Sequence, residues 1–355
     1  MLTMEHLLKL IVDRGASDLH LTVGIPPQLR IDGQLTYTDN QALDPETIKT
    51  LAYSLLTDDQ IGWFEKGKEL DFSCGIENVS RFRINLYYQR GSVAMAARVI
   101  PFVIPTIEDL GLPGVVKEYA DKPNGLVLIT GATGSGKSTT QAAIIDYINK
   151  RRRAHIISVE DPIEYLHRHQ LCTINQRQLG TDTLSFPEAL KHVLRQDPDI
   201  VVIGEMRDLE TIQAALTLAE TGHLVFATLH TSSAVNSITR IVDVFPAHQQ
   251  QQIRVQLSLV LVGVLVQRLV PNAHDGGRSL VMEIMTMIPG IQNLIRENQI
   301  HQIYSLIQTG RRFGMKTMNQ ALCDLIVEDK ITFGEALKNT LDEQELNALV
   351  QKAKH

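Results

Sequence analysis

A glycine-rich segment, GATGSGKS at residues 131–138, carries the most specific chemical signal in this sequence. It matches G-x-x-x-x-G-K-[ST] between a strand-like and a helix-like run, the context in which such loops bind phosphate. Gly134 and Gly136 allow backbone N–H groups to turn toward phosphate oxygens. Lys137 would contact the β- and γ-phosphates, and Ser138 would ligate magnesium. The expected nucleotide-binding residues are Thr133, Gly134, Ser135, Gly136, Lys137, Ser138 and Thr139.

Two carboxylates could complete a nucleotide-hydrolysing site. Residues 199–206, DIVVIGEM, form an apolar strand that ends in an acid. Glu205 should therefore lie at the carboxyl edge of a sheet, where ligands bind in open α/β folds, and bind magnesium or its water. Glu164 closes the acidic segment EDPIE and could orient the attacking water as a general base. From the residues alone, an acidic turn explains that segment equally well.

His230 follows the apolar run at 223–229 and could contact the γ-phosphate region and sense its loss. A single histidine in such a place is more often a capping or core residue. His223 begins the same run, and side chains seven residues apart on a strand point to opposite faces, so the two should not share a metal. The chain has no N-K-x-D guanine signature, which favours ATP over GTP.

Arginines near residue 90 form a separate candidate group. Arg81 and Arg83 alternate along one strand-like run, and Arg98 lies in the next. In a ring-shaped assembly these side chains could reach a neighbour's nucleotide and stabilise the transferred charge. Exposed strand arginines are the simpler explanation of the spacing.

The elements that must position these residues divide into two patterns. Residues 1–100 read as a small α+β domain with a helix at 2–13 and hairpins at 28–37 and 81–99. From residue 124, short apolar runs alternate with helical segments, as βαβ units require. We predict helices over 247–269, 290–298 and 315–328, and from 332 onward. The expected divisions are an N-terminal domain (1–100), a proline-punctuated linker (101–123), an ATPase core (124–289) and a helical C-terminal region (290–355).

Composition limits the class of protein. The 355 residues carry a formal net charge of −6, which argues against a chain that mainly coats nucleic acid. Three scattered cysteines without a CxxC pair make a disulfide framework or a cysteine zinc site improbable. We find no signal-peptide pattern at the start, and the longest apolar stretch, 257–266, is about half a membrane span. The expectation is a cytoplasmic protein without a membrane span.

Together these motifs resemble the secretion-ATPase superfamily, and within it the type IV pilus retraction ATPases. The Walker A segment is 131–138, the Asp box resembles ISVEDPIE at 157–164, and Walker B resembles 199–207. The His box is similar to TGHLVFATLHT at 221–231. Residues 290–297, GIQNLIRE, are similar to the retraction signature A-I-R-N-L-I-R-E and depart from it at Gly290 and Gln292.

The resemblance implies a PAS-like N-terminal domain followed by a RecA-like P-loop domain and a helical C-terminal region. It implies that Glu164, Glu205, His230 and Lys137 are catalytic, that ATP and Mg²⁺ are the cofactors, and that Ser138 and Glu205 hold the metal. Arg81, Arg83 and Arg98 gain plausibility as residues that act across subunits. The implied assembly is a homo-hexamer in the cytoplasm, at the inner-membrane base of the pilus machine. It would turn an inner-membrane platform protein and draw pilins out of the filament.

Four alternatives remain open at this point. Extension and type II secretion ATPases carry a four-cysteine zinc insert and an extra N-terminal domain; here QRLVPN at 267–272 runs on to residue 277 without a cysteine, and the first domain starts almost at Met1. An accessory paralogue could depend on, or work beside, other pilus ATPases. The remaining readings are a nucleotide-gated adaptor without useful turnover and a DNA-translocating ring.

Overall fold

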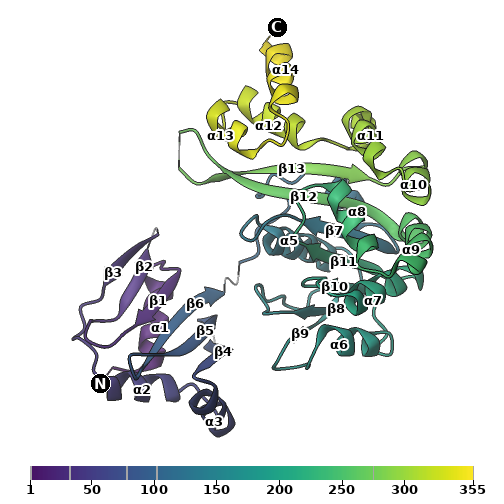
Figure 1. Ribbon diagram of the computed structural model, residues 1–355. Helices are drawn as coiled ribbons and strands as arrows, with labels where there is room; N and C mark the ends of the chain where they lie inside the picture. Colours follow the sequence, from purple (N-terminus) through teal and green to yellow (C-terminus); the bar gives the residue numbers. More distant parts are fainter. Residues whose placement is uncertain (1, 32, 77–78, 101–102, 275, 355) are drawn as a thin grey trace. The chain divides into compact units, whose positions relative to one another are not determined.

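The computed structural model describes residues 2–31, 33–76, 79–100, 103–274 and 276–354 (Figure 1). Its chain divides into two compact units. Unit 1 comprises Met1–Val103 with Glu164–Leu166, and unit 2 comprises Ile104–Ile163 with His167–His355. Of the segment expected to be a linker, 101–102 lie outside the described residues. Residues 104–123 belong to unit 2 and include the short helix α4 (Val115–Ala120).

Unit 1 is built on one antiparallel sheet of six strands in the order β3-β2-β1-β6-β5-β4. Its hairpins fall where the sequence predicts them. The elements are α1 (Met4–Asp13), β1 (Asp18–Leu21), β2 (Gln28–Ile31), β3 (Gln34–Tyr37), α2 (Pro45–Tyr53), α3 (Asp58–Gly67), β4 (Glu69–Ile76), β5 (Ser80–Gln89) and β6 (Ser92–Ile100).

Alternation along β5 gives this sheet one apolar face and one polar face. Phe82, Ile84 and Leu86 are fully buried in one hydrophobic cluster with apolar residues of α1 and α2. Arg81 and Arg83 point away from that core, because side chains alternate across a strand. The predicted placement of these two arginines on one face is thus confirmed.

Unit 2 contains a seven-stranded sheet in the order β13-β12-β7-β11-β10-β8-β9, which is parallel except for the antiparallel edge strand β13. The strands are β7 (Gly125–Thr130), β8 (His155–Glu160), β9 (Thr173–Gln178), β10 (Ile200–Ile203), β11 (Leu224–Leu229), β12 (Leu261–Pro271) and β13 (Arg278–Thr286). Central strands such as β7, β10 and β11 are buried throughout, as parallel strands covered on both faces should be.

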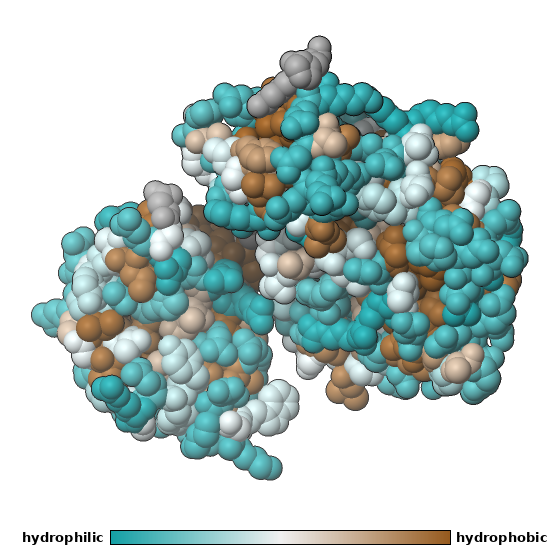
Figure 2. Space-filling model, turned by 45° about the horizontal axis from the view of Figure 1, so that its top comes forward, coloured by the Kyte–Doolittle hydropathy of each residue, from teal (hydrophilic) through white to brown (hydrophobic). Residues whose placement is uncertain are grey.

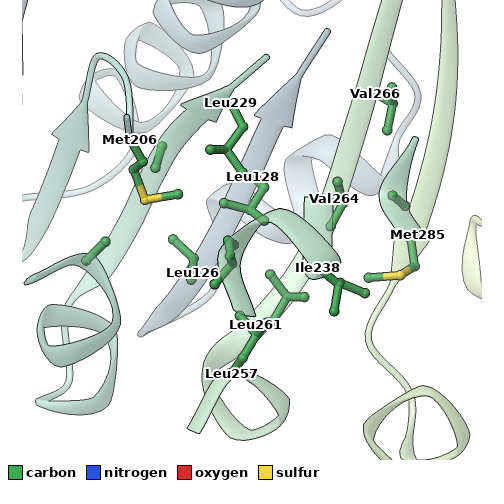
Figure 3. Close-up of a cluster of buried hydrophobic side chains, with 14 of the residues drawn as sticks. Leu126, Leu128, Met206, Leu229, Ile238, Leu257, Leu261, Val264, Val266 and Met285 are labelled. Carbon is green, nitrogen blue, oxygen red and sulfur yellow. The ribbon is translucent and has the colours of Figure 1, made fainter. Parts of the chain in front are cut away.

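Two hydrophobic clusters cover the two faces of this sheet. Leu126 and Leu128 of β7 enter one cluster, shown in Figure 3, whereas Val127 and Ile129 enter the other. The helices that pack in the first cluster are α6 (Phe186–Val193), α7 (Leu209–Glu220), α8 (Ala234–Asp243) and α9 (Ala247–Val260). The second contains α4 and α5 (Lys137–Asn149).

Short helices follow β13 and complete the first cluster. They are α10 (Pro289–Arg296), α11 (Ile303–Thr309), α12 (Met318–Val327), α13 (Phe333–Asn339) and α14 (Glu343–Lys354), joined by two 3-10 turns, η1 (Ile300–Gln302) and η2 (Arg311–Phe313). The mixed α/β fold class with a helical C-terminal region is therefore confirmed.

The predicted helix over 247–269 is wrong in its second half. Helix α9 ends at Val260, and the chain continues as strand β12, which lies between β7 and β13. Leu261, Val264 and Val266 are buried, and a short continuous apolar run fits a buried strand as well as a helix. Gly263 allows β12 to pass close to Tyr119, because a Cβ at this position would lie 2.5 Å from the Tyr119 ring.

Within the described part of the chain, we find no helix with the length and apolar character needed to cross a bilayer. Hydrophobic residues on the face shown in Figure 2 are interspersed with hydrophilic ones on both units.

Candidate nucleotide-binding site

The glycine-rich loop joins β7 to α5 and has the backbone form that phosphate binding requires. Gly134 and Gly136 have φ angles of 78° and 89°, in the left-handed region that glycine tolerates. Gly131 cannot carry a side chain, because a Cβ would lie 2.4 Å from the Gln267 carbonyl oxygen and 2.5 Å from Ser135 Oγ. Strand β12 thus packs closely against the start of the loop. The helix predicted for this part of the chain would not have implied that contact.

Lys137 is the first residue of α5 and folds back over the loop. Its Nζ donates to the carbonyl oxygens of Gly131 and Ala132 at 2.9 and 3.0 Å. The N-cap residue of α5 is Gly136, which has no side chain to occupy the first backbone N–H groups of the helix. This combination of a cation and a helix N-terminus favours an anion at the loop.

Glu205 and His230 meet at the carboxyl edge of the same sheet. Glu205 lies two residues beyond β10, and His230 directly follows β11. His230 Nε2 is 3.2 Å from Glu205 Oε1, and the Glu205 side chain is 20% exposed. Leu229 of β11 pairs with Thr130 of β7, so the next residues, His230 and Gly131, lie close together at the start of the glycine-rich loop. Three predicted site segments therefore converge at one sheet edge.

Arg207 is a member of this cluster that the sequence analysis missed. Its Nη2 lies 2.7 Å from Glu205 Oε2. Burial raises the pKa of the Glu205 carboxyl, but the hydrogen bond from Arg207 and the charge of His230 outweigh burial and hold that pKa below its ordinary value. Glu205 is accordingly a carboxylate at neutral pH. The sequence places Glu205 two residues before Arg207, but no sequence pattern indicates that the two side chains contact each other.

The Asp-box segment starts beside the Walker B segment. Gly204 N donates to Val159 O at 2.8 Å, and a Cβ on Gly204 would lie 3.1 Å from Glu160 Cα. The carboxylate of Glu160 accepts hydrogen bonds from Ser158 at 2.6 Å and Gln176 at 3.2 Å, which ties it to the sheet. Glu164 is exposed on an irregular segment after β8 and belongs to unit 1, whereas the loop, Glu205 and His230 belong to unit 2. Its role as a general base stays a prediction.

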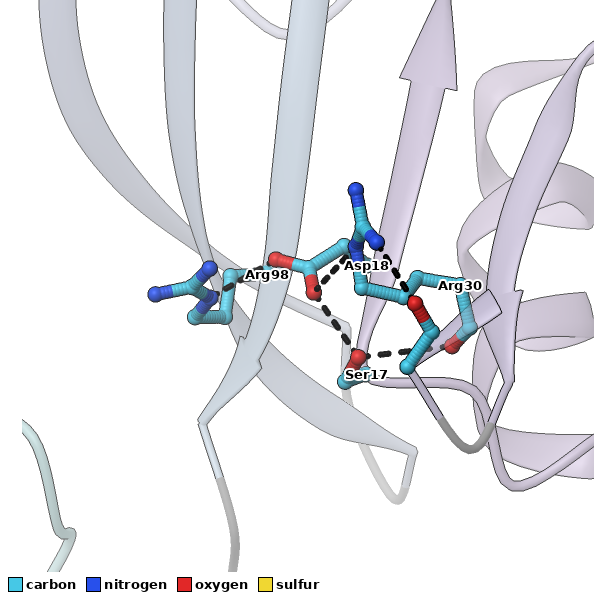
Figure 4. A network of polar contacts seen from close by, with 5 residues as sticks. Ser17, Asp18, Arg30 and Arg98 are labelled. Atoms are coloured by element: carbon cyan, nitrogen blue, oxygen red, sulfur yellow. Dashed lines mark hydrogen bonds and ion pairs between the residues drawn. The ribbon is translucent and has the colours of Figure 1, made fainter. Parts of the chain in front are cut away.

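The three candidate arginines all have partners within unit 1. Arg81 donates to Ser73 Oγ at 2.6 Å, and Arg98 Nε donates to Asp18 Oδ1 at 2.7 Å. Arg83 Nη2 lies 4.0 Å from the nearest Asp71 oxygen, which is a weak ion pair. Figure 4 shows that Arg98 reaches Asp18 through its Nε.

Oxygen donors for a magnesium ion are present at the loop. The Ser138 hydroxyl and the Glu205 carboxylate are of the type that Mg²⁺ prefers, and Mg²⁺ in nucleotide sites uses one or two protein ligands plus phosphates and water. Among the described residues, no group of three or more His, Cys, Asp or Glu could hold a metal ion by itself. The donor set fits a metal shared with a nucleotide.

A phosphate-binding loop on a central parallel strand, with an acid at the end of another strand of the sheet, defines a P-loop ATPase of the RecA-like kind. Residues 107–338 match the family described as type II/IV secretion system protein. The chain belongs to this family of secretion ATPases.

Relatives match it over nearly their whole length. The chain is 47% identical to the type IV pilus retraction ATPase PilT of Pseudomonas aeruginosa, over 93% of this chain and 95% of that protein. It is 40% identical to the type IV pilus ATPase PilU of the same organism, over 98% and 91%. A crystal structure of the pilus retraction motor PilT with bound ADP superposes with a TM-score of 0.93 at 48% identity, over 98% of this chain and all of that one.

Proposed function

We propose that this chain powers type IV pilus retraction by hydrolysing ATP as a homo-hexameric ring. The observation that carries the proposal is the 47% identity to a retraction ATPase over nearly the full length of both chains. In this proposal the ring lies in the cytoplasm, at the inner-membrane base of the pilus machine, and acts on an inner-membrane platform protein. Changes in the ring during turnover would drive removal of pilins from the filament.

At each site, the loop residues Thr133 to Thr139 and the N-terminus of α5 bind the phosphates of ATP. Lys137 leaves the loop carbonyls and contacts the β- and γ-phosphates, which is a short move because its Nζ already lies over the loop. Ser138 and Glu205 would hold Mg²⁺ or its water. When bound, the metal neutralises charge that develops on the phosphates.

Glu164 accepts a proton from the attacking water, and His230 senses the γ-phosphate. The contact between His230 and Glu205 supports this role, because a γ-phosphate that attracts His230 would draw it from the carboxylate. Hydrolysis and phosphate release would then restore the pair. The nucleotide state is thereby converted into a position of the segment after β11.

An arginine of a neighbouring subunit completes the charge stabilisation in this proposal. Of Arg81, Arg83 and Arg98, we favour Arg83, because its partner within the chain is the most distant of the three. Releasing a weakly held side chain costs less free energy than breaking a hydrogen bond to a buried carboxylate.

Complementation tests the function. Expression of this chain in a retraction-null strain should restore twitching, and Lys137→Ala should not. Failure of the wild-type chain alone, with recovery when a second pilus ATPase is co-expressed, would favour an accessory role. The 40% identity to PilU over 98% of the chain makes that the second candidate. If the purified protein hydrolyses ATP but does not restore twitching, either alone or with a second pilus ATPase, both the motor role and the accessory role would be contradicted.

A further inference from the structure

A buried carboxylate lies between two helix N-termini on the C-terminal side of the ATPase core. Glu283, in strand β13, is 3% exposed. Its Oε1 accepts a hydrogen bond from the backbone N–H of Ala234 at 2.7 Å. The backbone N–H of Met318 is close enough to lower the pKa of the same carboxyl. Ala234 is the first residue of α8, and Met318 is the first residue of α12. Glu283 therefore bonds directly to the start of α8, and the next residue, Ile284, pairs with Lys316 just before α12.

The surroundings of Glu283 act on its carboxyl in opposite directions, and burial prevails, so the pKa lies above its ordinary value. Burial raises the pKa of its carboxyl, while the hydrogen bonds from Ala234 and Met318 and the nearby Arg268 guanidinium oppose that rise; Glu345 adds to it. Both backbone donors lie at the positive ends of helix dipoles, which attract a carboxylate. Removal of the carboxylate would leave the buried N–H of Ala234 without that acceptor.

Helix α8 begins four residues after His230. Ser233 caps the helix by accepting from Asn236 N, and the hydroxyls of Thr231 and Ser237 lie 2.7 Å apart. The segment that follows His230 is thus tied to the first turn of α8. A displacement of the His230 backbone would act on this turn through these hydrogen bonds.

Helix α12 begins at a junction of the C-terminal elements. Lys316 pairs with Ile284, the residue after Glu283, through backbone hydrogen bonds of 2.8 and 3.1 Å. Asn319 donates to Glu345 of α14 at 2.7 Å, and Tyr304 of α11 donates to the same carboxylate. The first turn of α12 consequently holds α11 and α14 in place.

We infer that Glu283 is a positioning residue that couples the segment after His230 to the C-terminal helices α11, α12 and α14. It would transmit the nucleotide state from the ATP site to the surface that these helices form. The inference rests on the sensing role proposed above for His230.

Hydrogen exchange of the full-length ring, with and without a non-hydrolysable ATP analogue, tests the coupling. Glu283→Gln keeps the size of the side chain and removes its charge. Ala234→Pro removes the backbone N–H that donates to Glu283. Proline is well accepted at the first helical position, and the extended backbone of Ser233 (φ −152°, ψ 161°) is the conformation favoured before a proline. Glu345→Gln is the matched control, because it alters the C-terminal junction without touching α8.

In the wild-type ring the analogue should change exchange in three places: the glycine-rich loop, residues 230–237 and residues 316–322. Both test variants should keep the first two changes and lose the third, and Glu345→Gln should keep all three. A wild-type response at 316–322 in either folded test variant would overturn the coupling, even if that variant is less stable. If the analogue changes exchange in the wild-type loop but not at 230–237, the sensing role of His230 would be overturned, and the coupling with it. Response at the loop and at 230–237 without one at 316–322 would overturn the coupling alone.

Discussion

Unit 1 and unit 2 each hold a carboxylate between two basic side chains. In unit 1, Asp18 lies 2.7 Å from Arg98 and 3.9 Å from Arg30 (Figure 4). In unit 2, Glu205 lies 2.7 Å from Arg207 and 3.2 Å from His230. Both carboxylates are largely buried, and both have a pKa below the ordinary value because their partners outweigh the effect of burial.

What differs is the backbone that carries each group. Asp18 lies within β1, with Arg30 of β2 and Arg98 of β6 directly opposite in register, so the ladder fixes all three residues. Arg207 and His230 lie in irregular segments beyond their strands, beside the phosphate-binding loop. Partners on such segments can be exchanged for phosphate or metal. A paired carboxylate alone therefore does not indicate a catalytic site. Our proposal for Glu205 rests on its place at the carboxyl edge of the sheet.

The largest expected effect is at the loop itself. Lys137→Ala should weaken ATP binding and reduce hydrolysis by about 10²–10³-fold, because a positioned cation at the phosphates is lost. Lys150→Ala is the control at the other end of α5, where Lys150 pairs with Asp146 at 2.6 Å. Nucleotide titration and phosphate release measure both effects. Equal affinity of the two variants would contradict the assignment of the loop.

Glu164→Gln should separate binding from turnover. We expect kcat to fall about 10²-fold through loss of a general base, with little change in nucleotide affinity. Glu188→Gln, an exposed acid on α6, provides the control. A Glu164→Gln variant with wild-type kcat would contradict the role of Glu164 as a general base and leave its segment as an acidic turn.

Arg207→Gln should have a smaller effect on hydrolysis than either change, because Arg207 orients Glu205 and contacts no phosphate in our account. Loss of about 10-fold in kcat is consistent with one lost charged hydrogen bond of about 1.5 kcal/mol. The affinity for ADP should stay close to that of the wild type. A variant without ADP affinity would place Arg207 on the nucleotide instead.

The smallest expected effect is on the acid stability of unit 1. The pKa of Asp18 is lowered on folding, so the charged pair stabilises the fold at neutral pH. That stabilisation is lost as the pH falls through the depressed pKa, below the ordinary value of 3.8. Arg98→Gln should raise this pKa, shift acid unfolding to higher pH and cost about 1 kcal/mol or less at neutral pH, since the Arg98 side chain is 70% exposed. An unchanged acid transition would contradict the pairing.

The sequence predicted the parts of the site that local pattern determines. The glycine-rich loop, Glu205 and His230 each follow a strand with a clear apolar run, so their place at one sheet edge could be inferred before the fold was known. The mutual contact of Glu205, Arg207 and His230 could not, because it depends on side-chain directions in irregular segments.

Contacts between residues far apart in the sequence could not be predicted either. Asp18 and Arg98 are 80 residues apart, and only the neighbouring positions of β1 and β6 bring them together. The sequence pattern of β12 predicts a helix, because the apolar run of a strand buried on both faces lacks alternation. The support that β12 gives to Gly131, and the bridge that β13 makes through Glu283, were missed with it.

Phosphate release by the full-length chain, measured for the wild type, Glu205→Gln and Asp18→Asn, tests the central claim most directly. The claim is that one of two similarly paired carboxylates is catalytic. We predict a fall of about 10²-fold or more in Glu205→Gln, with ADP still bound, and near wild-type turnover in Asp18→Asn at a temperature where both are folded. Wild-type turnover in Glu205→Gln, or an equal loss in both variants, would contradict the account.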